Sequence, residues 1–314
     1  IRHLDATRAL IGVAGQTAVL TQVKYSINEL EDMLHGIFLV RERTPRTLDY
    51  IMSFGERLSA FIIAEAIKDA GLPAAFLDAR KVIKTDDHFG YARVDFNQTD
   101  SLIREYFSTV KELQVVTGFI ASAPNGETTT LGRSGSDYTA AIFAGALGAA
   151  ALEIWTDVDG MMTADPRLVR KAYTMPSMTY EEAMELSHFG AKVIFPATMR
   201  PAMAHHIPIW IKNTFNPKAE GTVIRGSNTD ARPIKGISSM NGISLLNVQG
   251  SGLMGVVGVS RRVFETLARE QVNVVLISQA SSEHSICIAI ETTQSQKAKQ
   301  ALESEFQHEI TDGL

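Results

Sequence analysis

A short stretch rich in glycine and serine carries the first residues that could do chemistry. Residues 131–139 read LGRSGSDYT, follow an apolar run rich in β-branched residues, and precede an alanine-rich segment. Glycines there let the backbone approach an anion, and free amides at a helix start favour negative charge. Arg133 could hold a carboxylate or phosphate through paired hydrogen bonds, and Asp137 could orient a metal or a cation. A capped turn with Ser136 or Asp137 as N-cap explains the same residues.

A second polar group follows another apolar segment. Thr156, Asp157 and Asp159 come after the predicted strand 152–155, and Arg167 ends an Asp-Pro-Arg triplet. Acids just past the carboxyl end of a strand lie where α/β sheets bind ligands. Two acids at this spacing suit Mg²⁺, and Arg167 suits a phosphate. The alternative is an Asp/Gly turn followed by a surface Asp-Pro-Arg corner.

Two charged residues and a histidine pair complete the candidates. Lys192 lies within FGAKVIFP, where apolar neighbours would hold it near a nucleotide; the alternative is a lysine whose stem covers apolar surface while its ammonium reaches water. Glu56 stands near a helix start, where a carboxylate is favoured whatever its function. The adjacent His205 and His206 diverge on a helix and have no acidic or cysteine partner at ligand spacing, so no metal site built from protein side chains is predicted.

Composition limits the class of protein. The chain has 314 residues, which allows about two domains, and its 45% hydrophobic and 21% charged content is typical of globular proteins. A net charge of −5 without a basic cluster gives no support to nucleic-acid binding. The single cysteine, Cys287, excludes a disulfide framework and favours a reducing, cytoplasmic location. No apolar run is long enough to predict a membrane span.

The elements that must position the first group alternate between helices and short strands. This alternation predicts a three-layer α/β domain with a mostly parallel sheet over residues 1–230. Gly12 and Gly15 mark a helix break, Gly36 a helix end, and Thr44-Pro45 a helix start. The predicted helices are 4–36, 55–70, 137–149 and one from 179, and the predicted strands are 74–77, 115–120, 128–131, 152–155 and 208–211. Thr179 and Glu182 have capping-box spacing, and the turn Pro124-Asn125-Gly126 predicts a hairpin into strand 128–131.

Residues 231–314 follow a different order. Strands are predicted at 242–249, 272–278 and 285–290, helices at 257–270 and 295–306, and a last strand near His308. The order β-α-β-β-α-β is the ferredoxin-like plan. The sequence therefore predicts a second, smaller domain after residue 230.

Several ordered stretches resemble the aspartate kinases. They are FGERLSA at 54–60, VVTGFIA at 115–121, GETTTLGRSGSDYTAA at 126–141, EIWTDVDGMMTADPR at 153–167 and EAMELSHFGAKVIFPAT at 182–198. Members have an amino-acid-kinase fold followed by ACT regulatory domains, which implies those folds for the two predicted domains. IWIKNT at 209–214 and VLISQASSE at 275–283 resemble the kinase half of bifunctional aspartate kinase–homoserine dehydrogenases.

The resemblance implies transfer of the γ-phosphoryl group of ATP, with Mg²⁺, to the β-carboxylate of L-aspartate. The product would be 4-phospho-L-aspartate, the first intermediate of threonine, methionine and lysine synthesis. A carboxylate is already nucleophilic at neutral pH, so positioning and charge neutralisation would carry the catalysis. By resemblance, Glu56, Phe119, Arg133 and Ser136 bind the substrate, with Arg133 and Asp137 catalytic. The nucleotide would contact Thr156, Asp157, Arg167, Lys192 and Val193. Met162 stands where many members carry tyrosine, which departs from the family pattern.

One departure concerns the family's first strand. Members begin with Lys-Phe-Gly-Gly-Thr-Ser, whose lysine meets the phosphates, and this motif is absent from the sequence. Losing one preorganised electrostatic group costs about 10²-fold or more in rate, so we expect the chain alone to be a poor kinase.

The ACT resemblance also implies an amino-acid effector and a homo-oligomer. Lysine-sensitive members carry an aspartate that aligns with Val275, which offers an ammonium no partner. Gln279 aligns with a glutamine associated with threonine sensing, so the resemblance implies threonine as inhibitor, near Asn273, Ile277 and Gln279. A simple strand cap is the alternative for Gln279.

Two other functions remain compatible with the sequence. One is a catalytically incomplete module that senses amino acids and forms oligomers. The other is a different amino-acid kinase, with acetylglutamate or UMP as acceptor.

Overall fold

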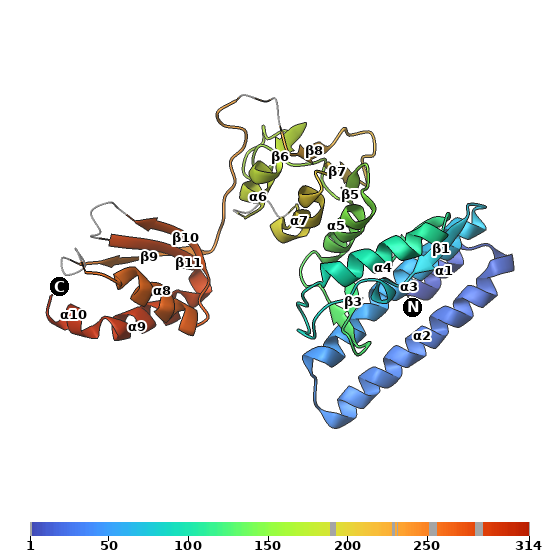
Figure 1. The fold of residues 1–314 in the computed structure, drawn as a ribbon, viewed down its shortest axis with the longest axis horizontal. Helices are drawn as coiled ribbons and strands as arrows, with labels where there is room; N and C mark the ends of the chain where they lie inside the picture. The colour runs from blue at the N-terminus through green and yellow to red at the C-terminus, as the bar shows by residue number, and fades with distance from the viewer. Residues whose placement is uncertain are drawn as a thin grey trace. The chain divides into compact units, whose positions relative to one another are not determined.

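The computed structural model describes residues 2–188, 193–227, 230, 232–250, 256–279 and 285–313 (Figure 1). Contacts within the chain divide it into two compact units, Ile1–Ser238 and Ser239–Leu314. The division falls after residue 230, where the sequence pattern changes. Among the described residues, no helix is both long enough and apolar enough to cross a membrane.

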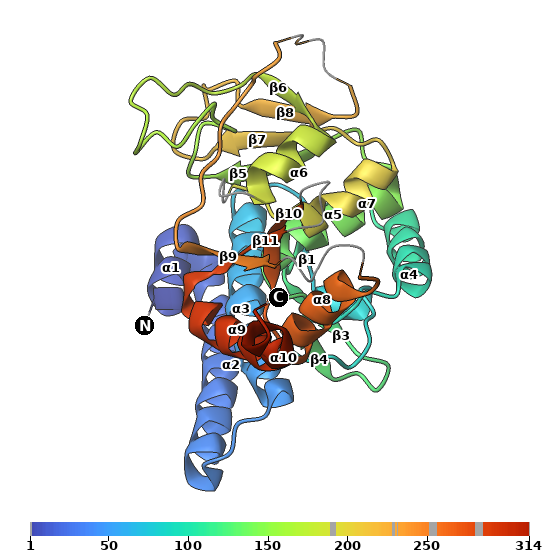
Figure 2. The ribbon, with the colours of Figure 1, turned by 90° about the vertical axis from the view of Figure 1, so that its left-hand side faces the viewer.

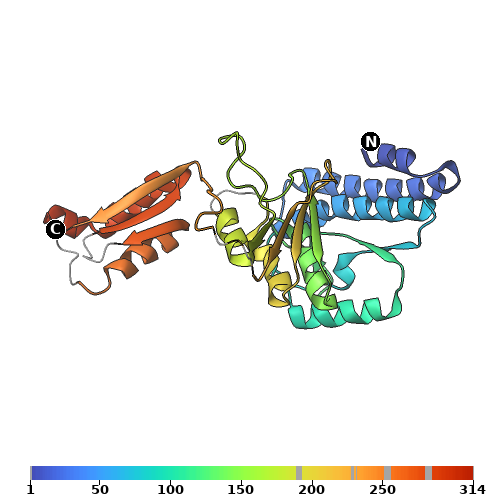
Figure 3. The ribbon, with the colours of Figure 1, turned by 90° about the horizontal axis from the view of Figure 1, so that it is seen from above.

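The first unit begins with three helices, α1 (Arg2–Leu10), α2 (Val13–Val40) and α3 (Pro45–Asp69), of which α2 and α3 lie side by side (Figure 3). The predicted break at Gly12 is confirmed. The predicted end at Gly36 is wrong, because α2 continues to Val40 and closes at Arg41 in a left-handed conformation. A glycine inside a helix costs only about 1 kcal/mol, which the surrounding helical residues offset. Thr44 caps α3 as predicted, accepting a hydrogen bond from the Thr47 amide at 3.2 Å.

A parallel strand pair and a hairpin follow α3. The elements are β1 (Ala74–Leu77), the 3-10 turn η1 (Ala79–Lys81), α4 (Phe96–Thr109), β2 (Leu113–Val116), β3 (Ile120–Ser122) and β4 (Thr128–Thr130). β1 and β2 pair in parallel, and β3 and β4 form the predicted hairpin. The predicted single strand 115–120 is wrong, since the chain turns at 117–119 and Phe119 takes a φ of 67°.

The rest of the first unit is a four-stranded sheet with helices. Its elements are α5 (Gly135–Leu147), β5 (Leu152–Thr156), β6 (Ser177–Thr179), α6 (Tyr180–His188), α7 (Pro196–Ala204), β7 (Ile209–Asn213) and β8 (Thr222–Arg225). The strand order is β5-β7-β8-β6, in which β5–β7 and β6–β8 are parallel and β7–β8 is antiparallel (Figure 2). This mixed α/β arrangement with parallel strand pairs confirms the predicted fold class.

Local signals predicted two helix starts in this region, and one of them is confirmed. Thr179 and Glu182 form the predicted capping box, since each backbone amide donates to the other's side chain, at 2.8 and 3.2 Å. The prediction that Ser136 or Asp137 caps α5 is wrong, because α5 begins at Gly135 and Ser134 is its N-cap, with a φ of 52°. The core under the sheet is apolar and includes Met161, Met178, Met199, Ile209 and Ile211.

The second unit has three strands and two long helices. Its elements are β9 (Ile243–Gln249), α8 (Val259–Arg269), β10 (Val274–Gln279), β11 (Ser285–Glu291), η3 (Thr292–Gln294), α9 (Ser295–Glu305) and α10 (Gln307–Thr311). The sheet is antiparallel in the order β10-β11-β9, with the helices on one face (Figure 1). The strand predicted near His308 is wrong, and α10 occupies its place. Arg262 explains the helix, because it pairs with Glu305 and Glu309 and lies over the Phe306 ring at 4.3 Å.

Candidate active site

Two backbone segments interlock at the start of α5. One is the turn 117–119 after β2, and the other is the loop 132–136 after β4. A Cβ added to Gly118 would lie 2.9 Å from the Ser136 Cα, and one added to Gly135 would lie 3.1 Å from the Phe119 Cα. The Phe119 amide donates to Thr139 Oγ1 at 3.0 Å. Only glycine allows this approach, so the two segments form one fixed junction.

Glu56 lies in the middle of α3 and reaches the same junction; the prediction that it stands near a helix start is wrong, because α3 already begins at Pro45. Its carboxylate accepts hydrogen bonds from the Gly118 amide and from the Ser136 side chain. Burial raises the pKa of Glu56, and these two hydrogen bonds oppose that shift without cancelling it. The structure therefore brings together Glu56, Phe119 and Ser136, three residues that the resemblance assigned to the substrate.

Arg133 and Asp137 flank this junction. Arg133 lines a cavity of about 200 Å³ together with Phe195, and its guanidinium carbon lies 6.0 Å from the centroid of that ring. Asp137 lies in the first turn of α5, and burial raises the pKa of its carboxyl group. The sequence-predicted guanidinium thus faces a cavity, and Asp137 is a carboxyl group partly removed from water.

The residues after β5 form a second polar group. The Thr156 hydroxyl donates to Asp157 Oδ1 at 3.2 Å, and Asp159 accepts from the side-chain amide of Asn213 at 2.8 Å. The short connection 148–151 forces α5 to run back along β5. The start of α5 and the carboxyl end of β5 therefore lie at the same end of this α/β layer.

The remaining predicted nucleotide residues are placed differently. Arg167 forms paired hydrogen bonds with Asp165, at 2.8 Å between Nη2 and Oδ2, and its side chain is 87% exposed. Val193 is half-buried and packs against the core of the four-stranded sheet. Lys192 lies outside the described residues. Thr156 and Asp157 are therefore hydrogen-bonded to each other, while Arg167 is engaged in an ion pair with Asp165.

Asp137 and Asp157 are the carboxylates at this end that could contact a metal ion. Within the described ranges, no three His, Cys, Asp or Glu side chains converge in a way that could hold a metal ion. Mg²⁺ that travels with a nucleotide takes most of its ligands from phosphates and water, and needs only one or two carboxylates. Asp137 and Asp157 fit that role, whereas a metal held by protein side chains alone does not fit.

Sequence reasoning missed a buried carboxylate behind the site. Asp49 on α3 is 1% exposed and accepts hydrogen bonds from the Thr130 amide, the Thr130 hydroxyl and the Gly90 amide, at 3.0, 2.8 and 2.8 Å. It ties α3 to β4 and to the turn that precedes Tyr91. The available signal was an aspartate within the otherwise apolar stretch LDYIMSF, since a buried charge requires partners.

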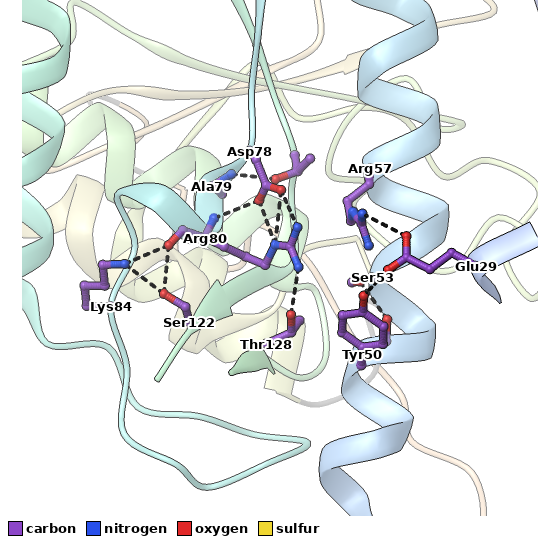
Figure 4. A network of polar contacts seen from close by, with 11 residues as sticks. Glu29, Tyr50, Ser53, Arg57, Asp78, Ala79, Arg80, Lys84, Ser122 and Thr128 are labelled. Atoms are coloured by element: carbon purple, nitrogen blue, oxygen red, sulfur yellow. Dashed lines mark hydrogen bonds and ion pairs between the residues drawn. The ribbon is translucent and has the colours of Figure 1, made fainter. Parts of the chain in front are cut away.

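A second missed network holds the hairpin in place (Figure 4). Arg80 pairs with Asp78 at 2.6 Å and donates to Thr128 Oγ1 at 2.9 Å, while Lys84 donates to the Arg80 carbonyl and to Ser122 Oγ, both at 2.9 Å. These contacts fasten the chain after β1 to both strands of the β3–β4 hairpin. The hairpin in turn carries the loop that contains Arg133.

The residues predicted to bind an effector lie along the edge strand of the second unit. Gln279 ends β10, where it pairs with Ile286 of β11. Ile277 shares its face of the strand, because side chains alternate, and it is 54% exposed. Asn273 precedes the strand and is also exposed.

Comparison with known proteins agrees with this architecture. Residues 4–213 match the amino acid kinase family, and residues 246–306 match an ACT domain. The chain therefore belongs to the amino acid kinase family.

Several similar proteins within that family are aspartokinases. Bifunctional aspartokinase/homoserine dehydrogenase 1 of Arabidopsis thaliana is 36% identical over 95% of the chain, and the match covers 34% of that relative. Lysine-sensitive aspartokinase 3 of Escherichia coli is 35% identical over 92% of the chain, covering 65% of that protein. The solved structure of Escherichia coli aspartokinase III with aspartate and ADP has a TM-score of 0.72 and 30% identity, covering 92% of this chain and 70% of that one. The chain spans about a third of the length of the bifunctional relatives.

Proposed function

We propose that the chain is an aspartate kinase, which transfers the γ-phosphoryl group of ATP to the β-carboxylate of L-aspartate. The junction at the start of α5 carries this proposal. Arg133 offers a planar pair of donors for the α-carboxylate, and Glu56 offers a carboxylate for the ammonium. Both groups flank a backbone that Gly118 and Gly135 hold in one conformation. Support comes from Escherichia coli aspartokinase III, whose solved structure contains aspartate and ADP.

The reaction follows from positioning rather than from proton transfer. An oxygen of the β-carboxylate forms a bond to the γ-phosphorus while the bond to the bridging oxygen of ADP breaks, and no proton has to move. Mg²⁺ bound with ATP supplies charge neutralisation on the phosphates. Asp137 and Asp157 would hold that metal-nucleotide unit, and Thr156 would bind the nucleotide. Lys192 and Val193 would line the nucleotide beside them, and Arg167 would join after leaving Asp165.

The test measures which acceptor releases ADP. L-Aspartate, N-acetylglutamate and UMP are each supplied with Mg-ATP, and we expect release with L-aspartate alone. Arg133→Gln should weaken this activity by about 10²-fold, the usual cost of removing one preorganised donor, while the exposed control Arg8→Gln should not change it. Release with UMP or N-acetylglutamate in place of aspartate would refute the proposal. Aspartate binding without any release would favour the amino-acid-sensing module instead.

We further propose that the second unit binds threonine as a feedback inhibitor. Val275 offers no charge to a lysine ammonium, and the amide of Gln279 at the end of β10 can pair with a hydroxyl and a carboxylate. Lysine is the competing effector, because one relative is a lysine-sensitive aspartokinase. Calorimetric titration with threonine and with lysine decides between them, and heat from lysine alone would reverse the assignment.

We propose that the second unit also forms a homo-oligomer in the cytoplasm. Leu245 of β9 and Leu276 of β10 both pair with Ala289 of β11, so they lie in one row across the sheet. Their side chains are exposed, which leaves apolar surface for a second copy to cover. Sedimentation analysis should show an oligomer that Leu276→Asp dissociates and that Lys299→Asp, on the helical face, does not.

A further inference from the structure

Three arginines from distant parts of the chain line the cavity that Arg133 faces. Arg93 precedes α4, Arg133 precedes α5, and Arg200 lies on α7. Tyr91, Tyr138 and Phe195 form much of the remaining wall. The residues that line the cavity include no aspartate or glutamate.

Among the described residues, no carboxylate neutralises the three guanidiniums. In the described part of the chain, none of them forms an ion pair with a carboxylate, whereas Arg80, Arg167 and Arg262 all do. Like charges around one small space repel each other, and a low-dielectric wall strengthens that repulsion. An anion placed between them removes the cost.

Contacts around the cavity keep the arginines in place. Arg133 lies over the Phe195 ring. Arg200 lies near the Tyr138 phenol. Burial raises the pKa of Tyr138, and the Arg200 guanidinium opposes part of that rise. The backbone at Arg93 is fixed on both sides by Asp86, through an amide-to-carboxylate bond and an amide-to-carbonyl bond of 2.9 Å each. The cluster is therefore a built feature of the fold.

The size of the cavity limits the ligand. Its volume of about 200 Å³ is below the roughly 300–1,000 Å³ usual for cofactors and drug-sized ligands, so a whole nucleotide does not fit. Guanidinium forks match carboxylate and phosphate oxygens, and three of them match an anion with two or more charges.

We propose that this cavity binds a small multivalent oxyanion, held jointly by Arg93, Arg133 and Arg200. This site goes beyond the proposed function, because Arg93 and Arg200 have no part in that function. The anion shares Arg133 with the aspartate α-carboxylate and therefore competes with aspartate, a consequence that rests on the proposed function.

Calorimetry at constant ionic strength tests the site directly. Inorganic phosphate and citrate are titrated in separate arms into the wild-type chain, Arg93→Gln, Arg200→Gln and the exposed control Arg8→Gln. We expect saturable binding in at least one arm, with the Kd raised about tenfold or more by either cavity variant, the equivalent of one charge-assisted contact, and unchanged in the control. The arm with the lower Kd identifies the anion as a phosphate or a polycarboxylate. Arg93 and Arg200 are exposed, so thermal unfolding should confirm that their variants fold.

Two results would overturn the site: no saturable heat in either arm, or equal affinity in wild type and both cavity variants. Aspartate titrations keep this outcome separate from the fate of the proposed function. With the better anion present, the Kd for aspartate should rise in wild type and rise much less in Arg93→Gln. If the anion binds as expected and aspartate does not bind at all, the kinase proposal fails while the anion site stands.

Discussion

The two polar groups at the ligand end of the first unit are held in contrasting ways. At the start of α5, backbone contacts at Gly118 and Gly135 leave no room for rearrangement, and Glu56 is bonded to both segments. After β5, Arg167 is exposed and paired with Asp165, two positions away. The first group is preorganised for a ligand, whereas in the second group Arg167 must give up its ion pair with Asp165 before it can bind one. Breaking each arrangement should therefore have effects of very different size.

The largest effect is expected behind the preorganised group. Asp49→Ala leaves the Thr130 amide, the Thr130 hydroxyl and the Gly90 amide without their acceptor. Each buried unsatisfied group costs about 1–3 kcal/mol, so the three together should lower the unfolding free energy by about 3 kcal/mol or more. Urea denaturation measures it. A loss below about 1 kcal/mol would mean that water replaces the carboxylate.

The glycine contacts should give the next largest effect. Gly118→Ala places a methyl group 2.9 Å from the Ser136 Cα, which has no room to move. Such overpacking costs about 1–3 kcal/mol. Gly55→Ala, inside α3 with no atom within 4 Å of the new methyl, is the matched control and should stabilise the chain by about 0.5–1 kcal/mol. Equal effects of the two substitutions in urea denaturation would contradict the interlocked junction.

The pH dependence of stability should sharpen the contrast. The pKa of Glu56 is raised by burial, so the folded chain keeps a proton that the unfolded chain has already lost. Stability is therefore lost as the pH rises from the ordinary carboxyl pKa of 4.5 through the raised pKa of the folded chain. Asp137, whose pKa burial also raises, acts in the same direction.

Glu56→Gln and Asp137→Asn should remove these contributions. As the pH rises from 4 to 8, the unfolding free energy of each variant should increase relative to wild type by about 1 kcal/mol or less. Urea denaturation across that pH range measures the difference. Glu303→Gln, on α9, serves as the exposed control for the loss of one carboxylate. A wild type that gains stability relative to both variants as the pH rises would contradict the assigned direction.

The smallest effect is expected after β5. Asp165→Asn should free Arg167, because an exposed pair contributes only about 0.2–1 kcal/mol. We expect little change in stability and a Mg-ATP affinity that rises by about 2–5-fold, measured by calorimetry. Arg167→Gln is the opposing variant and should lower the affinity. Tighter ATP binding in both variants would place Arg167 outside the nucleotide site.

The sequence predicted the parts of the fold that depend on neighbouring residues. The capping box at Thr179, the cap at Thr44 and the β3–β4 hairpin rest on contacts within a few positions, and all three are confirmed. The errors at 115–120 and near His308 arose where distant contacts override local preference. Thr117 accepts a hydrogen bond from the Ala79 amide at 2.8 Å, and Arg262 holds α10 from across the second unit.

The candidate site shows the same division. Arg133 occurs in a local pattern that suits an anion, and Asp137, Thr156 and Asp157 occur in patterns that suit a metal ion or a nucleotide, so all four could be singled out before any coordinates. The meeting of Glu56 with Ser136 was implied only by the resemblance. The cluster of Arg93, Arg133 and Arg200 has no sequence signal, since its members are brought together by folding alone.

The short connection between α5 and β5 has a mechanical consequence. Arg133, proposed to bind aspartate, and Asp157, proposed to bind the nucleotide, belong to one uninterrupted stretch of chain that folds back on itself at 148–151. The distance that a phosphoryl group would cross is therefore set by one helix, one strand and the connection between them. Inserting one residue into this connection would shift Arg133 relative to Asp157, even though every binding side chain is retained.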